Sequence, residues 1–276
     1  MTLFLVLLFT RSVLLLSHEN NRNHLHFVLC GLIKSIDDDE RQRQLLKNFA
    51  YQIQYFRNSF SNFQAIVVCN ADDDACISAI RNISNMHGLD VRIIAADVAT
   101  TTSQPGVYNK ERLEKMSFLR NQYLANLPAE TDIMAVLDFD LIGEIRPKAF
   151  EKGIISLLSN PSVDAVACNG RLAHWKNRYL YLYYDTIAFL GMDQEEPIIS
   201  WLSFQLKNAA QLFSCKRNVF RVKSAFGGLV LYKFSKLSLS NRYSCENQRS
   251  EHISYHKSLK QVLNKEFYFN IKTNLS

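Results

Sequence analysis

An apolar run that ends in two aspartates constrains the fold of this chain more than any other stretch. Residues 132–140 have the sequence Asp-Ile-Met-Ala-Val-Leu-Asp-Phe-Asp, and such a run is typical of a strand buried on both faces. Side chains alternate along a strand, so Asp138 and Asp140 should project to one side and Phe139 to the other. Two buried carboxylates need a positive charge, most simply a divalent metal ion. The alternative is that the pair begins a solvated loop.

Strand-like and helix-like patterns alternate around this run. Short apolar runs predict further strands at residues 26–33, 65–68, 91–95 and 164–168. Apolar side chains at helical spacing lie between them, and Asp37 to Asp39 and Pro147 are suited to helix starts. The order strand, helix, strand with short connections predicts an α/β fold, with a mostly parallel sheet covered by helices on both faces.

Candidate ligand-binding residues fall at one edge of this predicted sheet. Ligands of such folds lie outside the carboxyl ends of the strands, where Asn70, Asp138 and Asp140 are expected. The alternation breaks beyond residue 169, which predicts an irregular C-terminal subregion. We therefore expect one domain over 26–276, with a ligand-binding half to residue 168 and a second half after it.

The predicted helix at 110–127 carries arginine on its apolar side. On a helical wheel Arg120 falls within the stripe of leucine, methionine and tyrosine side chains, and Arg112 lies at its edge. A guanidinium that faces a core is seldom left unpaired. Two partners fit equally well, namely a neighbouring carboxylate or the phosphate oxygens of a ligand.

Composition limits the class of protein. The chain has 276 residues, 47% of them hydrophobic, and a net charge of +6 without a dense basic run, so nucleic acid is not an expected partner. Residues 1–17 are nearly all apolar but short and interrupted by Arg11, which favours a signal anchor or signal peptide over a full membrane span. An N-terminal strand or docking helix is the alternative, and the polar residues 18–25 indicate a linker.

Taken together, these segments resemble nucleotide-sugar glycosyltransferases of the GT-A fold, in which a buried strand ends in an Asp-x-Asp motif. The segment order is similar to the branch of the fungal capsule α-1,3-mannosyltransferases. The matching segments are Arg112 with Arg120-Asn121, Asp138-Phe139-Asp140, Tyr184-Asp185-Thr186, Val222 to Gly228, and Ser250-Glu251-His252. This chain departs from that branch where His252 replaces cysteine and where the Asp-x-Asp motif is complete.

The resemblance implies a metal-dependent transfer of a hexose, with mannose as one candidate, from a GDP- or UDP-sugar to a glycan or glycoconjugate. It implies that Asp138, Asp140 and His252 hold Mn²⁺ or Mg²⁺. The residues expected to contact the donor are Asn70, Arg112, Arg120, Asn121, Phe226, Gly227 and Gly228. Glu251 and Asp185 are the candidates for a general base, which only an inverting enzyme needs.

Two other classes stay open. A haloacid-dehalogenase-like phosphohydrolase also places Asp-x-Asp after an apolar strand, but that family expects Thr or Val where Ile142 stands. A catalytically inactive sugar-binding protein of the same fold is the second. A glycosyltransferase with an N-terminal anchor would be expected at the Golgi or ER membrane, and a cytoplasmic location is the alternative.

Overall fold

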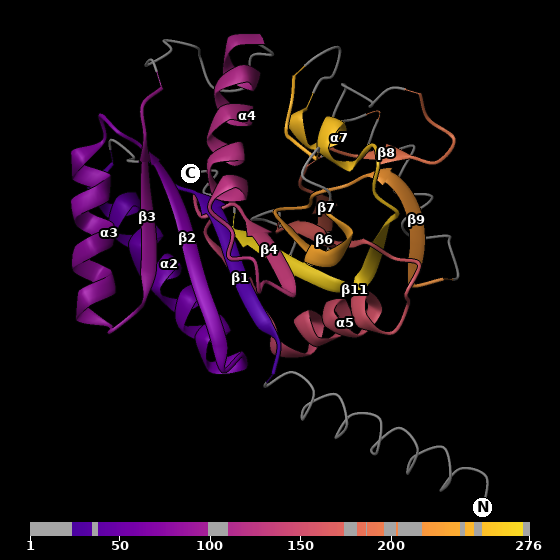
Figure 1. Ribbon diagram of the computed structural model, residues 1–276, viewed down its shortest axis with the longest axis horizontal. Coiled ribbons are helices and arrows are strands. Elements are labelled where there is room, and N and C mark those ends of the chain that lie inside the picture. Colours follow the sequence, from indigo (N-terminus) through magenta and orange to yellow (C-terminus); the bar gives the residue numbers. More distant parts are fainter. Residues whose placement is uncertain are drawn as a thin grey trace, which may run out of the picture.

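A mixed β-sheet with helices on both faces forms the framework of the protein (Figure 1). The computed structural model describes residues 24–34, 38–98, 110–173, 181–185, 187–195, 203, 217–237, 241–245 and 250–272. The predicted anchor at 1–17 and most of the linker lie outside these ranges. No helix among the described residues is long and apolar enough to cross a membrane.

The N-terminal half alternates strands and helices as the sequence predicts. Its elements are β1 (His26–Leu32), α2 (Asp39–Ser59), β2 (Asn62–Asn70), α3 (Asp74–Met86), β3 (Val91–Ala96), α4 (Lys110–Ala125), β4 (Ile133–Leu137), β5 (Gly143–Ile145), α5 (Pro147–Leu158) and β6 (Ala165–Ala173). The strands β3, β2, β1 and β4 lie side by side in that order, and all three pairings are parallel. The prediction of an α/β fold with a parallel core is confirmed.

Local chemistry explains where the helices begin. The carboxylate of Asp38 accepts a hydrogen bond from the Arg41 N–H (2.9 Å), which satisfies a backbone donor that the first turn of α2 leaves free. Asp73 caps α3 in the same way. Pro147 occupies the first turn of α5, where its missing N–H and fixed φ carry no penalty.

The C-terminal half completes the same sheet rather than forming an appendage. Its elements are β7 (Tyr181–Tyr183), β8 (Leu190–Gly191), β9 (Val219–Ser224), β10 (Leu229–Lys233), the 3₁₀ turn η1 (Phe234–Lys236), α7 (Glu251–His256) and β11 (Gln261–Lys272). Strand β10 lies antiparallel between β4 and β6, and the order continues as β11, β9 and β8. Antiparallel pairs therefore dominate this half, and the sheet as a whole is mixed rather than mostly parallel.

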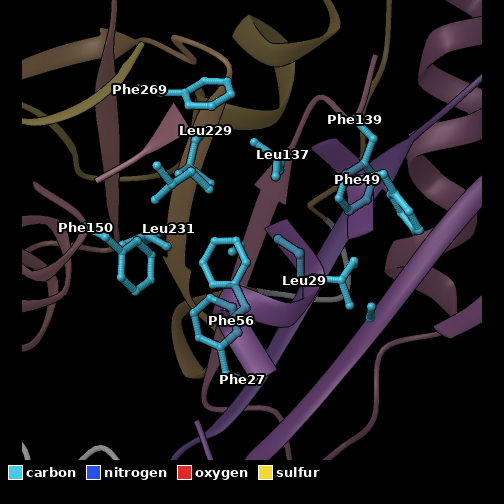
Figure 2. Packing of buried hydrophobic residues seen from close by; sticks show 14 of the residues in the cluster. Phe27, Leu29, Phe49, Phe56, Leu137, Phe139, Phe150, Leu229, Leu231 and Phe269 are labelled. Carbon is cyan, nitrogen blue, oxygen red and sulfur yellow. The ribbon is translucent and has the colours of Figure 1, made fainter. Parts of the chain in front are cut away.

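Alternation along the central strands divides the core between two faces. In β1, Phe27 and Leu29 pack with α2, α3 and α5, whereas Val28 and Cys30 pack with α4 and α7. Figure 2 shows the first of these clusters, where Phe27 and Leu29 meet aromatic side chains from α2 and α5. Because β4 follows the same alternation, a residue just beyond its end on the α4 side must face α4.

Candidate active site

The Asp138-Phe139-Asp140 segment forms a turn directly after β4. Phe139 packs into the α2 cluster, where its ring meets Phe49 edge-on at 5.0 Å between centroids (Figure 2). Asp138 takes the opposite side, toward α4, as alternation predicts. The Asp138 N–H donates to the Gly228 carbonyl (3.1 Å), and the Asp138 carbonyl accepts from the Leu141 N–H (3.3 Å). The backbone of the first aspartate is thus fixed from two directions.

Arg120 of α4 links this turn to α7. Its side chain is only 3% exposed, and it donates to Asp138 Oδ1 (3.0 Å) and to Glu251 Oε1 (3.0 Å). Its guanidinium also lies 5.3 Å from the ring centroid of Phe226 and 5.8 Å from that of Tyr243. The carboxylate partner that the sequence left open for Arg120 is therefore present, and it is one of the two motif aspartates.

The ion pair and its burial act in opposite directions on Arg120 and Asp138. Burial alone would lower the Arg120 pKa, but Asp138, Tyr123 and Glu251 raise it well above its ordinary value. Burial raises the pKa of Asp138 although the positive charge of Arg120 lowers it, and the negative charge of Asp140 raises it further. One guanidinium does not compensate the negative charge gathered here.

Two further aspartates add to this excess of negative charge. Asp185, beyond β7, has its pKa raised to about 6, chiefly by burial, although the Ala188 N–H donates to it (3.2 Å). The proximity of Glu251 raises it further. Asp140 is exposed, yet partial desolvation still raises its pKa, although the positive charges of Arg120, Lys34 and Arg112 lower it. Raised carboxylate pKa values clustered at a sheet edge are typical of functional sites.

The predicted residues of α7 and of the β9–β10 turn join this cluster. His252 is buried and stacks on Phe226, with ring centroids 4.0 Å apart. Its Nε2 lies 3.9 Å from Glu251 Oε1, and burial followed by the charge of Arg120 lowers the His252 pKa well below its ordinary value. The lowered pKa favours the neutral imidazole, which is the form that a metal ligand needs.

Glycine is required at the β9–β10 turn for reasons of backbone geometry. Gly227 and Gly228 have φ of +62° and +85°, which side chains rarely tolerate. A Cβ on Gly227 would lie 2.3 Å from the Cys168 carbonyl oxygen, so the turn is packed directly against β6. This geometry accounts for both glycines without a ligand. Their contact with a donor sugar stays a prediction.

Two predicted donor-binding residues have structural partners. The Asn121 amide donates to the Tyr243 carbonyl (3.0 Å) and accepts from the Tyr243 N–H (2.9 Å), which fastens this segment to α4. Asn70, at the carboxyl end of β2, accepts from the Val98 N–H (3.3 Å) and so shapes the turn after β3. Arg112 is exposed on the first turns of α4, close enough to lower the pKa of Asp140 and Asp185.

The metal-binding set proposed from the resemblance is not assembled as a complete cage. Among the described residues, no three His, Cys, Asp or Glu side chains lie together in an arrangement that could hold a metal ion. The ring of His252 is instead packed against Phe226, and one carboxylate oxygen of Asp138 accepts from Arg120. Magnesium is commonly bound by one or two carboxylates together with substrate phosphates. Asp138 and Asp140 fit that partial role.

Sequence reasoning missed two contributors to the site. Lys34 lies two residues beyond the end of β1 and lowers the pKa of Asp140, and its position near the carboxyl end of a core strand was the available signal. Tyr243 packs on His252 and Arg120 and shares a hydrogen bond with Tyr123 (3.0 Å between hydroxyl oxygens). Nothing in the local sequence around Tyr243 distinguishes it from other tyrosines.

Comparisons with known proteins reveal only distant similarities. No protein-family model matches the chain, and no curated protein matches it. Mouse xyloside xylosyltransferase 1 in its apo form is similar over 88% of this chain and 79% of its own, at 12% identity and a TM-score of 0.35. A glycosyltransferase involved in the glycosylation of the major capsid of PBCV-1 is similar over 56% of this chain and 55% of its own, at 14% identity and a TM-score of 0.26.

The 4-diphosphocytidyl-2C-methyl-D-erythritol synthase from Anaerococcus prevotii gives a further match, at 13% identity and a TM-score of 0.35. The match covers 62% of this chain and 61% of that synthase, so less than two thirds of its length is spanned. These similarities to sugar- and nucleotide-transferring enzymes are too distant to carry a functional inference, which has to come from the site itself.

Proposed function

We propose that the protein is a glycosyltransferase that moves a sugar from a nucleoside diphosphate sugar to a glycan or glycoconjugate. The observation that carries this proposal is the charge imbalance at the carboxyl end of β4. Four acidic side chains, Asp138, Asp140, Asp185 and Glu251, influence one another there, and Arg120 forms ion pairs with Asp138 and Glu251. A bound cation would relieve the repulsion between them.

A divalent metal that arrives with the donor matches this arrangement. Asp138 and Asp140 would supply two carboxylates to Mn²⁺ or Mg²⁺, and the donor diphosphate would supply the remaining oxygens. When bound, such an ion acts as a Lewis acid that stabilises negative charge on the departing nucleotide. Arg120 bonds to Oδ1 of Asp138, and Asp140 is exposed, and both observations support this assignment.

The residues of the chain have separable roles in this proposal. Arg120 holds Asp138 and Glu251 at fixed positions, since it contacts both at 3.0 Å. Arg112, exposed at the same edge, would bind the donor phosphates. Asp185, with its pKa raised to about 6, has the affinity for protons that a general base toward an acceptor hydroxyl requires. Glu251 is less suited to that role because Arg120 occupies it.

Other parts of the proposal rest on the resemblance alone. They are GDP or UDP as the donor nucleotide, a contact between Asn70 and its base, His252 as an additional metal ligand, and a Golgi or ER membrane location. The two aspartates and the sheet edge that they occupy do not depend on these details.

The proposal is tested by nucleotide release and sugar transfer from a panel of UDP- and GDP-sugars, with Mn²⁺ or with EDTA. Wild-type protein should turn over one donor only with metal, and Asp140→Asn should lose at least about 100-fold of that activity. Asp132→Asn is the matched control, because Asp132 lies at the opposite end of β4, where it accepts from the His26 N–H (2.9 Å). Metal-dependent turnover that survives in Asp140→Asn would contradict the assignment.

A phosphohydrolase is less compatible with the geometry. That reaction needs the first aspartate free as a nucleophile, whereas Asp138 Oδ1 accepts a hydrogen bond from Arg120 (3.0 Å). Hydrolysis of a simple phosphate ester without nucleotide sugar would nevertheless favour it. A sugar-binding protein without turnover is the other alternative, and donor binding without nucleotide release would identify it.

A further inference from the structure

A cavity outside the carboxylate cluster lies between β8, β9 and α7. Its volume is about 400 Å³, which is enough for a small organic ligand or for part of a larger one. The floor consists of four buried apolar side chains, Leu190, Val222, Ile253 and Leu259. Met192, which is 52% exposed, stands at the mouth. Such a floor favours a ligand with an apolar portion, because each buried methylene contributes about 0.8 kcal/mol.

The rim of the same cavity is strongly cationic. Four exposed basic side chains line it, Arg221, Lys223, Lys257 and Lys260, against a single carboxylate from Glu195. They come from two segments, since Arg221 and Lys223 belong to β9 and Lys257 and Lys260 lie in the connection between α7 and β11. A concave site with one sign of charge attracts a ligand of the opposite sign. The ligand that fits both parts is an anion attached to an apolar chain.

The cavity and the carboxylate cluster share two elements. On α7, Glu251 contacts Arg120 while Ile253 lines the cavity, as does Lys257 at the C-cap, and these positions span roughly 9 Å along a helix. Strand β9 lines the cavity with Val222 and then leads into Phe226 of the cluster. The cavity is therefore built on elements that also supply residues of the carboxylate cluster.

We infer that this cavity binds a phosphate ester of an apolar alcohol. On the proposed glycosyltransferase function, on which this part rests, such an ester is the carrier of the acceptor sugar. The apolar chain would lie on the floor and the phosphate would meet the rim. The sugar attached to the phosphate would be the acceptor of the transfer.

Binding is measured first, without any nucleotide sugar. Isothermal titration of the full chain with n-octyl phosphate below its micellar concentration is compared with inorganic phosphate and with n-octyl glucoside. Octyl phosphate should bind at least about ten-fold more tightly than either, because only it satisfies both floor and rim. Equal binding of inorganic phosphate would show a plain anion site, and equal binding of octyl glucoside would show unspecific detergent uptake. Either result overturns the inference.

Charge variants locate the site. Arg221→Gln with Lys257→Gln should weaken octyl phosphate binding at least about ten-fold. Lys47→Gln with Arg81→Gln makes the same change in net charge on exposed positions of α2 and α3, and should leave binding within about two-fold. Unchanged binding in the rim variant, with folding verified by circular dichroism, overturns the inference.

The experiments distinguish a cavity that does not bind the ester from a protein that is not a glycosyltransferase. Asp140→Asn should bind octyl phosphate as the wild type does, even though it loses donor turnover. If transfer is observed, the rim variant should raise the KM for a sugar joined to octyl phosphate and leave the KM for the donor unchanged. Octyl phosphate binding without any transfer would support the cavity and refute the acceptor role. Transfer that is insensitive to the rim variant would also refute that role.

Discussion

Arg120 is the residue on which the local structure of the site most depends. It is buried, it pairs with carboxylates from two segments, and two aromatic rings cover its guanidinium. Removal of one partner from a buried ion pair leaves the other charge unpaired, which costs far more than the pair itself contributes. Without Arg120, the charges of Asp138 and Glu251 would both be left unpaired.

Arg120→Leu should therefore lower the free energy of unfolding by about 3–5 kcal/mol, measured by urea denaturation. Adding Glu251→Gln to Arg120→Leu should restore part of that loss, because it removes one of the orphaned charges. Arg43→Leu is the matched control, since its pair with Glu40 (3.2 Å) is about two-thirds exposed and should change stability by less than about 1 kcal/mol. A loss in Arg120→Leu no larger than that control would contradict the assigned network.

Asp185 makes stability depend on pH in the metal-free protein. Its folded pKa of about 6 lies above the ordinary value of 3.8, so folding disfavours the charged form. The contribution of protonated Asp185 to the stability of the folded state is fully present below about pH 4, and it is lost as the pH rises through 6. Asp185→Asn removes this loss while its amide oxygen still accepts from Ala188 N–H.

We expect Asp185→Asn to be about 1–3 kcal/mol more stable than wild type at pH 8 and nearly equal to it at pH 4. Thermal unfolding in EDTA across that range measures the difference. If the difference in stability between Asp185→Asn and wild type is the same at pH 4 and at pH 8, Asp185 is not held in a desolvated position.

At the scale of elements, the β9–β10 turn is fixed by its glycines. Gly227 combines a left-handed φ with a Cys168 carbonyl that leaves no space for a Cβ, whereas Gly88 has φ of +59° and nothing within 4 Å. Gly88→Ala should cost only the conformational term of about 1–2 kcal/mol. Gly227→Ala should cost clearly more, because the backbone must also move. Equal losses in urea denaturation would mean that β6 and the turn are less tightly packed than described.

Periodicity predicted the elements of the N-terminal half closely. The strand expected at 26–33 is His26–Leu32, and the helix expected at 110–127 is Lys110–Ala125. These elements could be predicted because their burial alternates with a local period that the sequence records directly. The same reasoning placed Arg120 in the buried stripe and separated Asp138 from Phe139.

Pairing between distant segments could not be predicted in this way. Strand β10 inserts antiparallel between β4 and β6, and no local pattern specifies its neighbours. Arg120 and Glu251 are 131 residues apart, so their contact follows from the completed sheet. The sequence indicated which side chains are candidates for the site. It did not indicate that Arg120 would bond to an oxygen of Asp138 or that His252 would lie against Phe226.

At the scale of the whole molecule, the two halves of the chain meet at the site. The N-terminal half provides Arg120 and the aspartates after β4, and the C-terminal half provides Asp185, the glycine turn and α7. The resulting edge holds more negative than positive charge at close range. We therefore predict that nucleotide and metal ion bind together more strongly than either alone.

Isothermal titration of GDP and UDP with and without Mn²⁺, on wild type and Asp140→Asn, tests this central claim most directly. Asp140 is exposed, so its substitution should not disturb folding. We predict that Mn²⁺ strengthens binding of one nucleotide at least about ten-fold in the wild type and not in Asp140→Asn. Equal affinity in Mn²⁺ and EDTA, or a metal effect that persists in Asp140→Asn, would contradict it.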